Sequence, residues 1–167
     1  MVSLTSEQRK YCERLQHVVR VLLEVKEDGR LFSLRFWGSG DSGAIKELIN
    51  DNLLPEGSCG TVACAIGYAG LDPWFRRRGF ITQLNSSYKD STFSPRYRAS
   101  GSEVREFSAV QYFFDLAHDE TYELFVHNRY DEGYTIDDVI VRINKYITDR
   151  YGKEHVVTPE NVVFLGV

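Results

Sequence analysis

The stretch Pro55-Glu56-Gly57-Ser58-Cys59-Gly60-Thr61-Val62-Ala63-Cys64-Ala65-Ile66-Gly67-Tyr68-Ala69-Gly70 differs in composition from the rest of the chain. After Glu56 it carries no charge, and it holds two of the three cysteines. Ser58 stands in an N-cap position, apolar residues then recur at helical spacing, and Gly70 is a natural stop. We therefore expect a buried central helix over about residues 59–70, enclosed by other elements because it has almost no polar face.

Two interpretations of this helix remain open. In the first, Cys59 is a structural residue of a core helix. In the second, Cys59 is a reactive thiol, because a helix N-terminus lowers the pKa of a thiol. Cys59 and Cys64 lack the spacing of a zinc site, and the sequence has no second cysteine pair. We predict no metal site, no cofactor and no disulfide between Cys59 and Cys64.

Composition indicates one globular domain over residues 1–167, with 43% hydrophobic and 26% charged residues. The net charge of −4 argues against broad attraction to nucleic acid or to an anionic membrane. No apolar run approaches the length of a membrane-spanning helix, which is about 18 residues or more. The first ten residues are polar, unlike a signal peptide. We expect a cytoplasmic protein with reduced thiols and no membrane contact.

Working outward from the central stretch, hydrophobic periodicity and capping residues predict further elements. Helices are expected at 5–26, 44–53, 107–116, 120–127 and 136–151, and strands at 31–37, 80–84 and 96–99. Residues 38–43 are interpreted as a flexible loop, and residues 100–102 as the end of the last strand. In the first helix, Glu13, Arg14, Arg20 and Glu24 lie away from the apolar stripe, and His17 is interpreted as a packing residue. The expected fold is α+β, mainly helical, with a small antiparallel sheet.

The best binding candidates follow the central helix, in a turn expected over residues 73–78. Tryptophan and arginine contribute strongly to the energetics of interfaces. We therefore predict an exposed binding segment made of Trp74, Phe75, Arg76, Arg77 and Arg78. An alternative is that this region binds single-stranded nucleic acid, through basic residues that alternate with aromatic ones. The further residues of that alternative are Tyr88, Arg96, Tyr97 and Arg98.

The string from Cys59 to Gly67 resembles a C-G-T-x-x-C-x-x-G signature found in uncharacterised bacterial and phage proteins. The similarity extends from about Leu15 to Ile147 and includes Glu123-Leu124-Phe125 and a final helix that begins at a threonine. The polar segment 88–102 departs from it. The resemblance implies a shared fold and a bacterial or phage context, and the family has no established activity.

Cys59-Gly60 is also similar to the start of the central helix in papain-like peptidases and related hydrolases. That similarity implies a histidine base, for which His118, His127 and His155 are the candidates. His127 is followed by Asn128, which would orient it. The sequence departs from the pattern because the upstream glutamine of papain has no clear equivalent before Cys59, and because His127 is expected at the end of a helix rather than on a central strand.

These observations rank three functions. The first is a small cytosolic interaction or accessory protein without catalytic activity, which binds a protein partner or itself. The alternative is a cysteine hydrolase or acyltransferase that uses Cys59, His127 and Asn128. The further alternative is a nucleic-acid binder that uses the Arg76–Arg78 region.

Overall fold

The computed structural model describes residues 3–32, 38–39, 62–85, 92–99, 101–125 and 135–162. Its helices and its sheet confirm the predicted α+β class. The helices are α1 (Ser6–Glu27), α3 (Ala65–Leu71), α4 (Pro73–Arg76), α5 (Glu106–Phe114), α6 (His118–Phe125), α7 (Ile136–Tyr151) and the 3₁₀ turn η1 (Lys153–His155). The strands are β1 (Leu31–Phe32), β2 (Gly38–Ser39), β3 (Val62–Ala63), β4 (Phe80–Asn85), β5 (Thr92–Ala99) and β6 (Ser102–Arg105).

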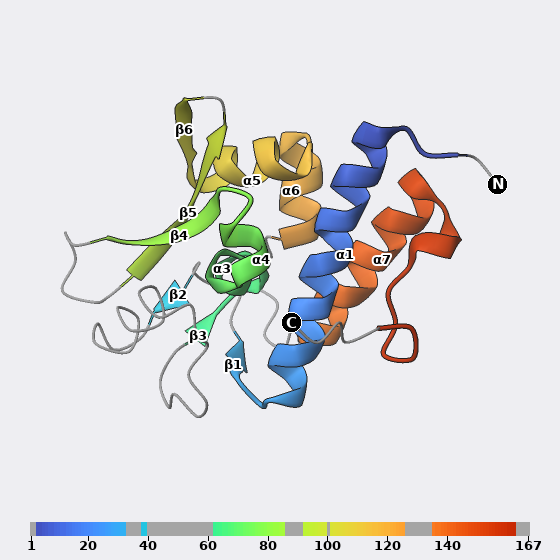
Figure 1. Cartoon of the computed structure of the whole chain (residues 1–167). Coiled ribbons are helices and arrows are strands. Elements are labelled where there is room, and N and C mark those ends of the chain that lie inside the picture. The colour runs from blue at the N-terminus through green and yellow to red at the C-terminus, as the bar shows by residue number, and fades with distance from the viewer. Residues whose placement is uncertain are drawn as a thin grey trace.

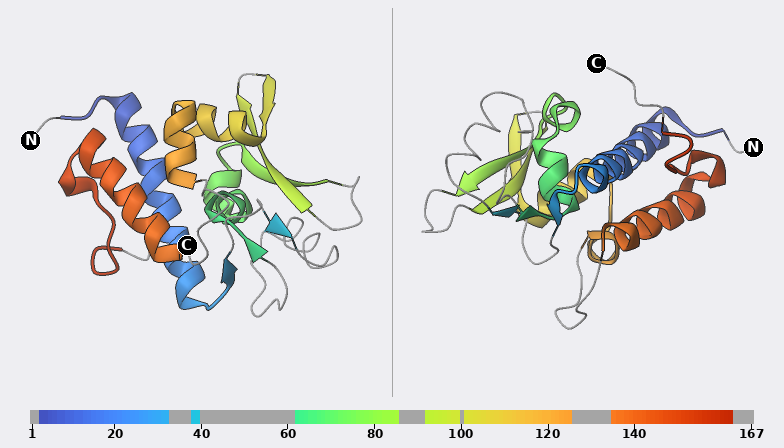
Figure 2. Two further views of the ribbon diagram at one scale, coloured as in Figure 1. Left: turned by 180° about the vertical axis from the view of Figure 1, so that it is seen from behind. Right: turned by 90° about the horizontal axis from the view of Figure 1, so that it is seen from below.

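The elements form layers with α1 and α3 at the centre. Helix α1 lies between α7 on one side and α3, α4 and the sheet on the other (Figures 1 and 2). The strand order is β1-β3-β2-β5-β4, and β6 pairs with β5. Strand β1 runs parallel to β3, and the other described pairings are antiparallel. The small sheet therefore stands at one side of a helical body.

Both long helices begin at the capping boxes that the sequence predicts. The Thr5 hydroxyl accepts from the Gln8 amide at 3.2 Å, and the Gln8 side chain accepts from the Thr5 amide at 3.0 Å. Thr135 and Asp138 make the same reciprocal pair at the start of α7. Each box satisfies amide groups that the first turn leaves without helical partners, so both starts are determined locally.

The central helix is shorter than predicted. Helix α3 begins at Ala65, and Cys64 is its N-cap through a hydrogen bond from the Gly67 amide to Sγ at 3.4 Å. The preceding residues form β3, which pairs with β1 and β2, and a chain held in a sheet cannot also be helical. The predicted N-cap, Ser58, lies outside the described residues. Every residue of α3 is buried, which confirms the helix as part of the core.

The sequence predicts that Gly70 ends the central helix, but Gly70 lies inside α3. A Cβ built at Gly70 would stand 2.4 Å from Thr82 Cγ2 and 2.9 Å from the Thr82 amide nitrogen. The glycine is required because α3 approaches β4 closely, and Asp72 is the C-cap instead. The main neighbours of α3 are α1, α4, β4 and β5. Helix α7 packs chiefly on α1.

An aromatic cluster fills the space between α4, β4 and α5. Its members Phe75, Phe80, Phe113 and Phe114 are fully buried, with ring centroids between 4.7 and 6.1 Å apart. Tyr97 of β5 packs edge-on against Phe113 at 5.1 Å. Such offset and edge-on pairs add to the burial of the ring surface. This cluster joins the sheet to α4 and α5, and α3 contacts β4 and β5 beside it.

Other boundaries also differ from the sequence prediction. Ser102 begins β6 rather than ending β5, and β2 occupies part of the expected loop 38–43. Helix α6 starts at His118, two residues before the predicted start at Glu120. The two differences in the strands share a cause, because short strands depend on partner strands whose pairing the local sequence does not reveal. The helix predicted at 44–53 lies outside the described residues.

Candidate functional site: a pocket between α1, α4 and the C-terminal segment

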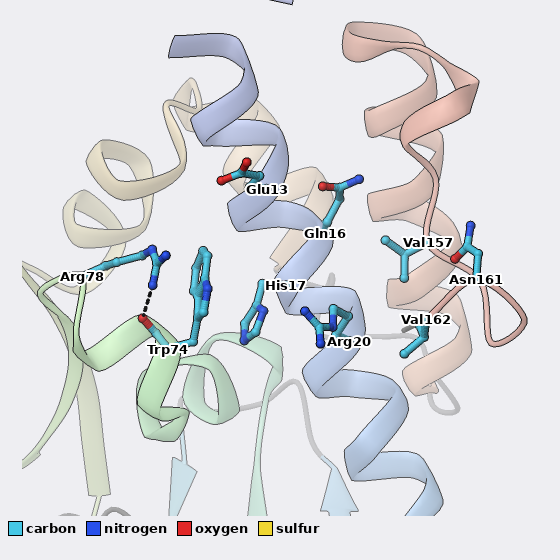
Figure 3. A pocket seen from close by; sticks show the side chains of 9 residues that line it. All are labelled: Glu13, Gln16, His17, Arg20, Trp74, Arg78, Val157, Asn161 and Val162. Atoms are coloured by element: carbon cyan, nitrogen blue, oxygen red, sulfur yellow. Dashed lines mark hydrogen bonds between the residues drawn. The ribbon is translucent and has the colours of Figure 1, made fainter. Parts of the chain in front are cut away.

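A pocket of about 340 Å³ lies where α1 faces α4 and the segment that follows α7 (Figure 3). Helix α1 supplies a polar row that the sequence places beside its buried stripe, and α4 with its following turn supplies an indole and a guanidinium. The C-terminal segment supplies two valines and an amide. The lining residues are Glu13, Gln16, His17, Arg20, Trp74, Arg78, Val157, Asn161 and Val162.

A stack of three side chains forms one wall of this pocket. The Trp74 indole lies between the Arg78 guanidinium and the His17 ring (Figure 3). Arg78 Cζ is 3.6 Å from the indole centroid, and the His17 ring is 4.2 Å from it with an interplanar angle of 15°. Arg78 Nη1 also donates to the Trp74 carbonyl at 3.1 Å. Both faces of the indole are therefore occupied, and the stack holds Arg78 at the pocket.

Asp72 joins the two helices behind this stack. Its Oδ1 accepts from the Trp74 amide at 2.8 Å and the Phe75 amide at 3.3 Å, which makes it the N-cap of α4. The same oxygen is 3.2 Å from His17 Nε2. A carboxylate oxygen only accepts, so Nε2 carries the proton and donates it. The pKa of the half-buried Glu24 carboxyl is raised by burial and then by the charge of Asp72.

Side-chain amides hold the C-terminal wall in place. Gln16 Nε2 donates to the His155 carbonyl at 2.7 Å, which ties α1 to the chain after α7. Asn144 makes two hydrogen bonds to the backbone of Val157, at 2.7 and 3.1 Å. Asn161 Nδ2 donates to the Val156 carbonyl at 2.8 Å. These bonds anchor an otherwise irregular segment, so the wall of the pocket is preformed.

The pocket carries more positive than negative charge. Arg20 and Arg78 line it together with one carboxylate, that of Glu13. The whole chain has a net charge of −4, so the local excess of positive charge at the pocket is opposite in sign to the net charge of the molecule. The lining residues include no serine, threonine or cysteine that could act as a nucleophile. The pocket is suited to binding a group that is anionic and partly apolar.

The structure brings together only part of the predicted binding segment. Trp74 and Arg78 line the pocket, and Arg77 is exposed but does not line it. Arg76 is half-buried. The expectation that Phe75 is exposed is wrong, because its ring is fully buried in the aromatic cluster. Successive residues of a helix point about 100° apart, so neighbours in α4 face different surroundings.

The residues of the hydrolase hypothesis, Cys59, His127 and Asn128, lie outside the described residues. The two described thiols, Cys12 and Cys64, are buried, and burial raises the pKa of each to about 11. Both are therefore protonated near neutral pH and unsuited to nucleophilic attack. Among the described residues, no group of three or more His, Cys, Asp or Glu side chains is placed to hold a metal ion.

The residues proposed to grip nucleic acid bases have other contacts. The faces of Trp74 are covered, and Tyr97 packs on Phe113. Arg96 and Arg98 both bond to Glu103 of β6, at 2.9 and 3.1 Å. Tyr88 lies outside the described residues. A stacking platform of the expected kind is not formed by these side chains.

Sequence reasoning missed Asp72 as the link between α1 and α4, and it misplaced Arg14. Asp72 before Pro73 is a recognisable helix start, but nothing in the sequence pairs it with His17. Arg14, expected away from the core, is buried, and its guanidinium lies 3.9 Å from the Phe113 ring centroid. Its Nη1 also donates to the Phe113 carbonyl. Burial lowers the pKa of this guanidinium from its usual value.

Comparisons with protein-family models, with curated proteins and with solved structures found no match. In the described part of the chain, no helix combines the length and the apolar character needed to cross a membrane. The function is therefore argued from the geometry of the pocket.

Proposed function

We propose that the protein works by binding, and that it takes an acidic segment of a protein partner into the pocket between α1 and α4. The observation that carries this proposal is the Arg78–Trp74–His17 stack, which holds at the pocket a guanidinium that forms no ion pair with any other described residue. In this proposal the protein is a non-catalytic accessory protein of a bacterial or phage-related cytoplasm, as the resemblance of the Cys59 motif implies.

Charge supports an acidic ligand. Arg20 and Arg78 contribute two positive charges to the lining, and Glu13 contributes one negative charge. A guanidinium matches a carboxylate with parallel hydrogen bonds, which gives direction as well as attraction. Because the whole chain has a net charge of −4, the attraction of an anionic segment to the pocket comes from the local arginines and not from the charge of the molecule as a whole.

The apolar part of the lining supports a peptide rather than a simple ion. Val157 and Val162 stand opposite the indole, so a ligand here can bury an aliphatic group beside its carboxylate. The volume of about 340 Å³ is at the low end for a ligand pocket and suits one or two side chains. A nucleic acid base is a poorer fit, because it would stack on an aromatic face and both faces of Trp74 are covered.

The test is binding of the acetylated tripeptide Glu-Leu-Glu, followed by the NMR signal of the Trp74 indole N–H. We expect this probe to shift the signal and the isosteric Gln-Leu-Gln to leave it unchanged. Arg78→Gln should weaken binding about tenfold, equivalent to about 1.4 kcal/mol. Glu13→Gln should tighten it, because it removes the repelling carboxylate. Lys145→Gln, on α7 outside the lining, is the control for net charge. Equal binding of both peptides, or of the wild type and Arg78→Gln, would contradict the proposal.

A second copy of the chain is one form that the partner can take. Sedimentation velocity of the wild type and of Arg78→Gln distinguishes the cases. A dimer that Arg78→Gln converts to a monomer places the acidic segment on the same chain. A monomer in both samples assigns the pocket to a different protein.

The hydrolase hypothesis is tested separately with iodoacetamide. Cys12 and Cys64 are buried with raised pKa values, so they should not react in the native state near neutral pH. Native labelling therefore reports Cys59 alone. Rapid labelling that is lost in His127→Ala would favour a catalytic Cys59 over the binding function.

A further inference from the structure

The outer face of β5 and β6 carries a cluster of arginines around one carboxylate. Glu103 accepts from Arg96 Nη1 at 2.9 Å, from Arg98 Nε at 3.1 Å and from Arg105 Nε at 3.1 Å. The register pairs Arg98 with Glu103 and Arg96 with Arg105, so all four side chains share one face of the sheet. We call these four residues the arginine cluster.

The cluster has an excess of two positive charges. Hydrogen bonds from Arg98, and then from Arg105 and Arg96, hold the pKa of Glu103 below its usual range, so its carboxylate is ionised at neutral pH. The side chains of Arg98 and Arg105 are 73% and 64% exposed despite their bonds to Glu103. Each of these three arginines gives Glu103 one nitrogen, and a guanidinium has five N–H donors. The side chain of Arg96 is only 15% exposed, so Arg98 and Arg105 are the members of the cluster that keep donors for an external anion.

A further arginine lies in the chain segment that precedes β4. The Arg98 amide donates to the Gly79 carbonyl at 3.1 Å, so the turn after α4 lies beside the end of β5. That turn carries Arg77, which is exposed and forms no ion pair with any other described residue. Adjacent strands are about 4.8 Å apart, so the backbone positions of Arg105, Arg98 and this turn extend over about 10 Å across three neighbouring segments. A row of this length suits several anionic groups in a chain rather than one.

From this row we infer that the outer face of β5 and β6 binds the phosphate backbone of a nucleic acid. Guanidinium forks match phosphate oxygens, and arginine clusters are a common means of holding them. Tyr97 and Val104 alternate to the opposite side of the sheet, where both pack against the core, so the paired residues of β5 and β6 that the structure describes place no aromatic ring on this face. Contacts limited to phosphate carry no sequence information, so this binding is independent of sequence. It uses a different surface from the pocket and does not depend on the function proposed there.

The experiment measures fluorescence anisotropy of a labelled single-stranded oligonucleotide of mixed sequence, with the full chain, between about 50 and 200 mM salt. With two or three phosphates neutralised, the logarithm of the affinity should fall with the logarithm of the salt concentration with a slope of about −1.4 to −2.1. A second oligonucleotide of different sequence should bind within twofold.

Variants separate the cluster from general charge effects. Arg98→Gln should weaken binding about fivefold and reduce the slope by about 0.7, the contribution of one phosphate. Glu103→Gln should tighten binding, because it releases three guanidinium groups, and loss of folding cannot produce that result. Glu13→Gln, in the pocket, should change the affinity less than twofold. Equal affinity of wild type, Arg98→Gln and Glu103→Gln overturns the inference. Polyglutamate that competes as well as a second oligonucleotide also overturns it, because it assigns the face to acidic proteins.

Discussion

Trp74 and Phe75 are neighbours in the chain and lie in different environments. Phe75 is fully buried among three other phenylalanine rings. Trp74 is half-buried, with an arginine over one face and a histidine over the other, and it lines the pocket. The two side chains are similar in hydrophobicity, so composition cannot separate them. Their roles follow from the direction in which one turn of helix, capped by Asp72, presents each residue.

The two sides of α4 should contribute differently to stability and to binding. The Phe75 side of α4 is dry and closely packed, so changes there should alter the free energy of unfolding. The Trp74 side is polar and preformed, so changes there should alter binding more than unfolding. The predictions below compare changes in the packed interior, including the Phe75 side of α4, with changes on the Trp74 side.

The largest effect is expected for Phe75→Ala. Removing a buried ring costs about 3–5 kcal/mol of unfolding free energy, through lost burial and the cavity left behind. Trp74→Ala should cost at least about 1 kcal/mol less, because the indole is already partly exposed. Urea denaturation followed by far-UV circular dichroism measures both. Phe75→Leu, which leaves a smaller cavity, is the control, and equal losses in the two alanine variants would remove the distinction between the faces.

Gly70→Ala should destabilise by about 1–3 kcal/mol, because a methyl group must displace Thr82. The new carbon would stand 2.4 Å from Thr82 Cγ2 and 2.9 Å from the Thr82 amide nitrogen. Thr82→Ser removes the first clash and leaves the second. The double variant should therefore recover part of the loss, and a thermal midpoint for Gly70→Ala equal to that of the wild type would contradict the close approach of α3 to β4.

The buried thiols predict a loss of stability in alkali. Burial raises the pKa of Cys12 and of Cys64 to about 11, above the 9.0 of an exposed thiol. The two thiols therefore bind their protons more tightly in the folded state than in the unfolded state. The contribution of the protonated thiols to the unfolding free energy is fully present below about pH 9 and is lost as the pH rises towards about pH 11. At about pH 10 the loss should be roughly 1 kcal/mol for each thiol. Urea denaturation curves at a series of pH values measure this loss, and in Cys12→Ala the unfolding free energy should fall by about half as much as in the wild type. An unfolding free energy of the wild type that does not change with pH would argue that the thiols are accessible.

Asp72 belongs to both sides of α4, because it caps the helix and contacts His17. Asp72→Ala should cost about 1 kcal/mol of unfolding free energy, typical of a lost N-cap. It should also release His17 and change the fluorescence of the indole stacked on it. Asp72→Asn keeps a capping oxygen, so it should retain most of the stability. If Asn and Ala variants are equally destabilised, the charge of Asp72 matters more than its capping role.

The smallest effect on folding is expected for Arg78→Gln, which should stay within about 0.5 kcal/mol of the wild type because the side chain is exposed. The same variant is expected to lose about tenfold in peptide affinity, equivalent to about 1.4 kcal/mol. A large drop in its thermal midpoint would mean that the stack stabilises the fold rather than a binding site.

Agreement between sequence and structure is closest where the determining chemistry is local. The Thr135 capping box and the apolar stripe of the last helix predict 136–151, and α7 spans Ile136–Tyr151. The N-terminal capping box places the start of α1 in the same way. Each signal lies within a few residues of the element that it determines, so no knowledge of the rest of the fold is needed.

A smaller part of the candidate site was also predictable. Trp74 and Arg78 stand out by residue type and by their position after Asp72-Pro73, a helix start that the sequence displays. His17 was interpreted only as a packing residue, and the contribution of Val157 and Asn161 was not foreseen. His17 joins the site through a bond to Asp72, which is 55 positions away, and the bond that ties α1 to the C-terminal segment, from Gln16 to His155, spans 139 positions.

The sequence by itself determined the helical periodicity, the caps and the α+β class, because these depend on neighbouring residues. Only the tertiary structure decided that the chain before Ala65 is a strand, that Gly70 stands inside a helix, and that Phe75 faces the core while Trp74 faces a pocket. Those outcomes depend on partners brought together by folding. Pairing with β1, the approach of β4 and the packing of α1 select among conformations that local preferences leave close in energy.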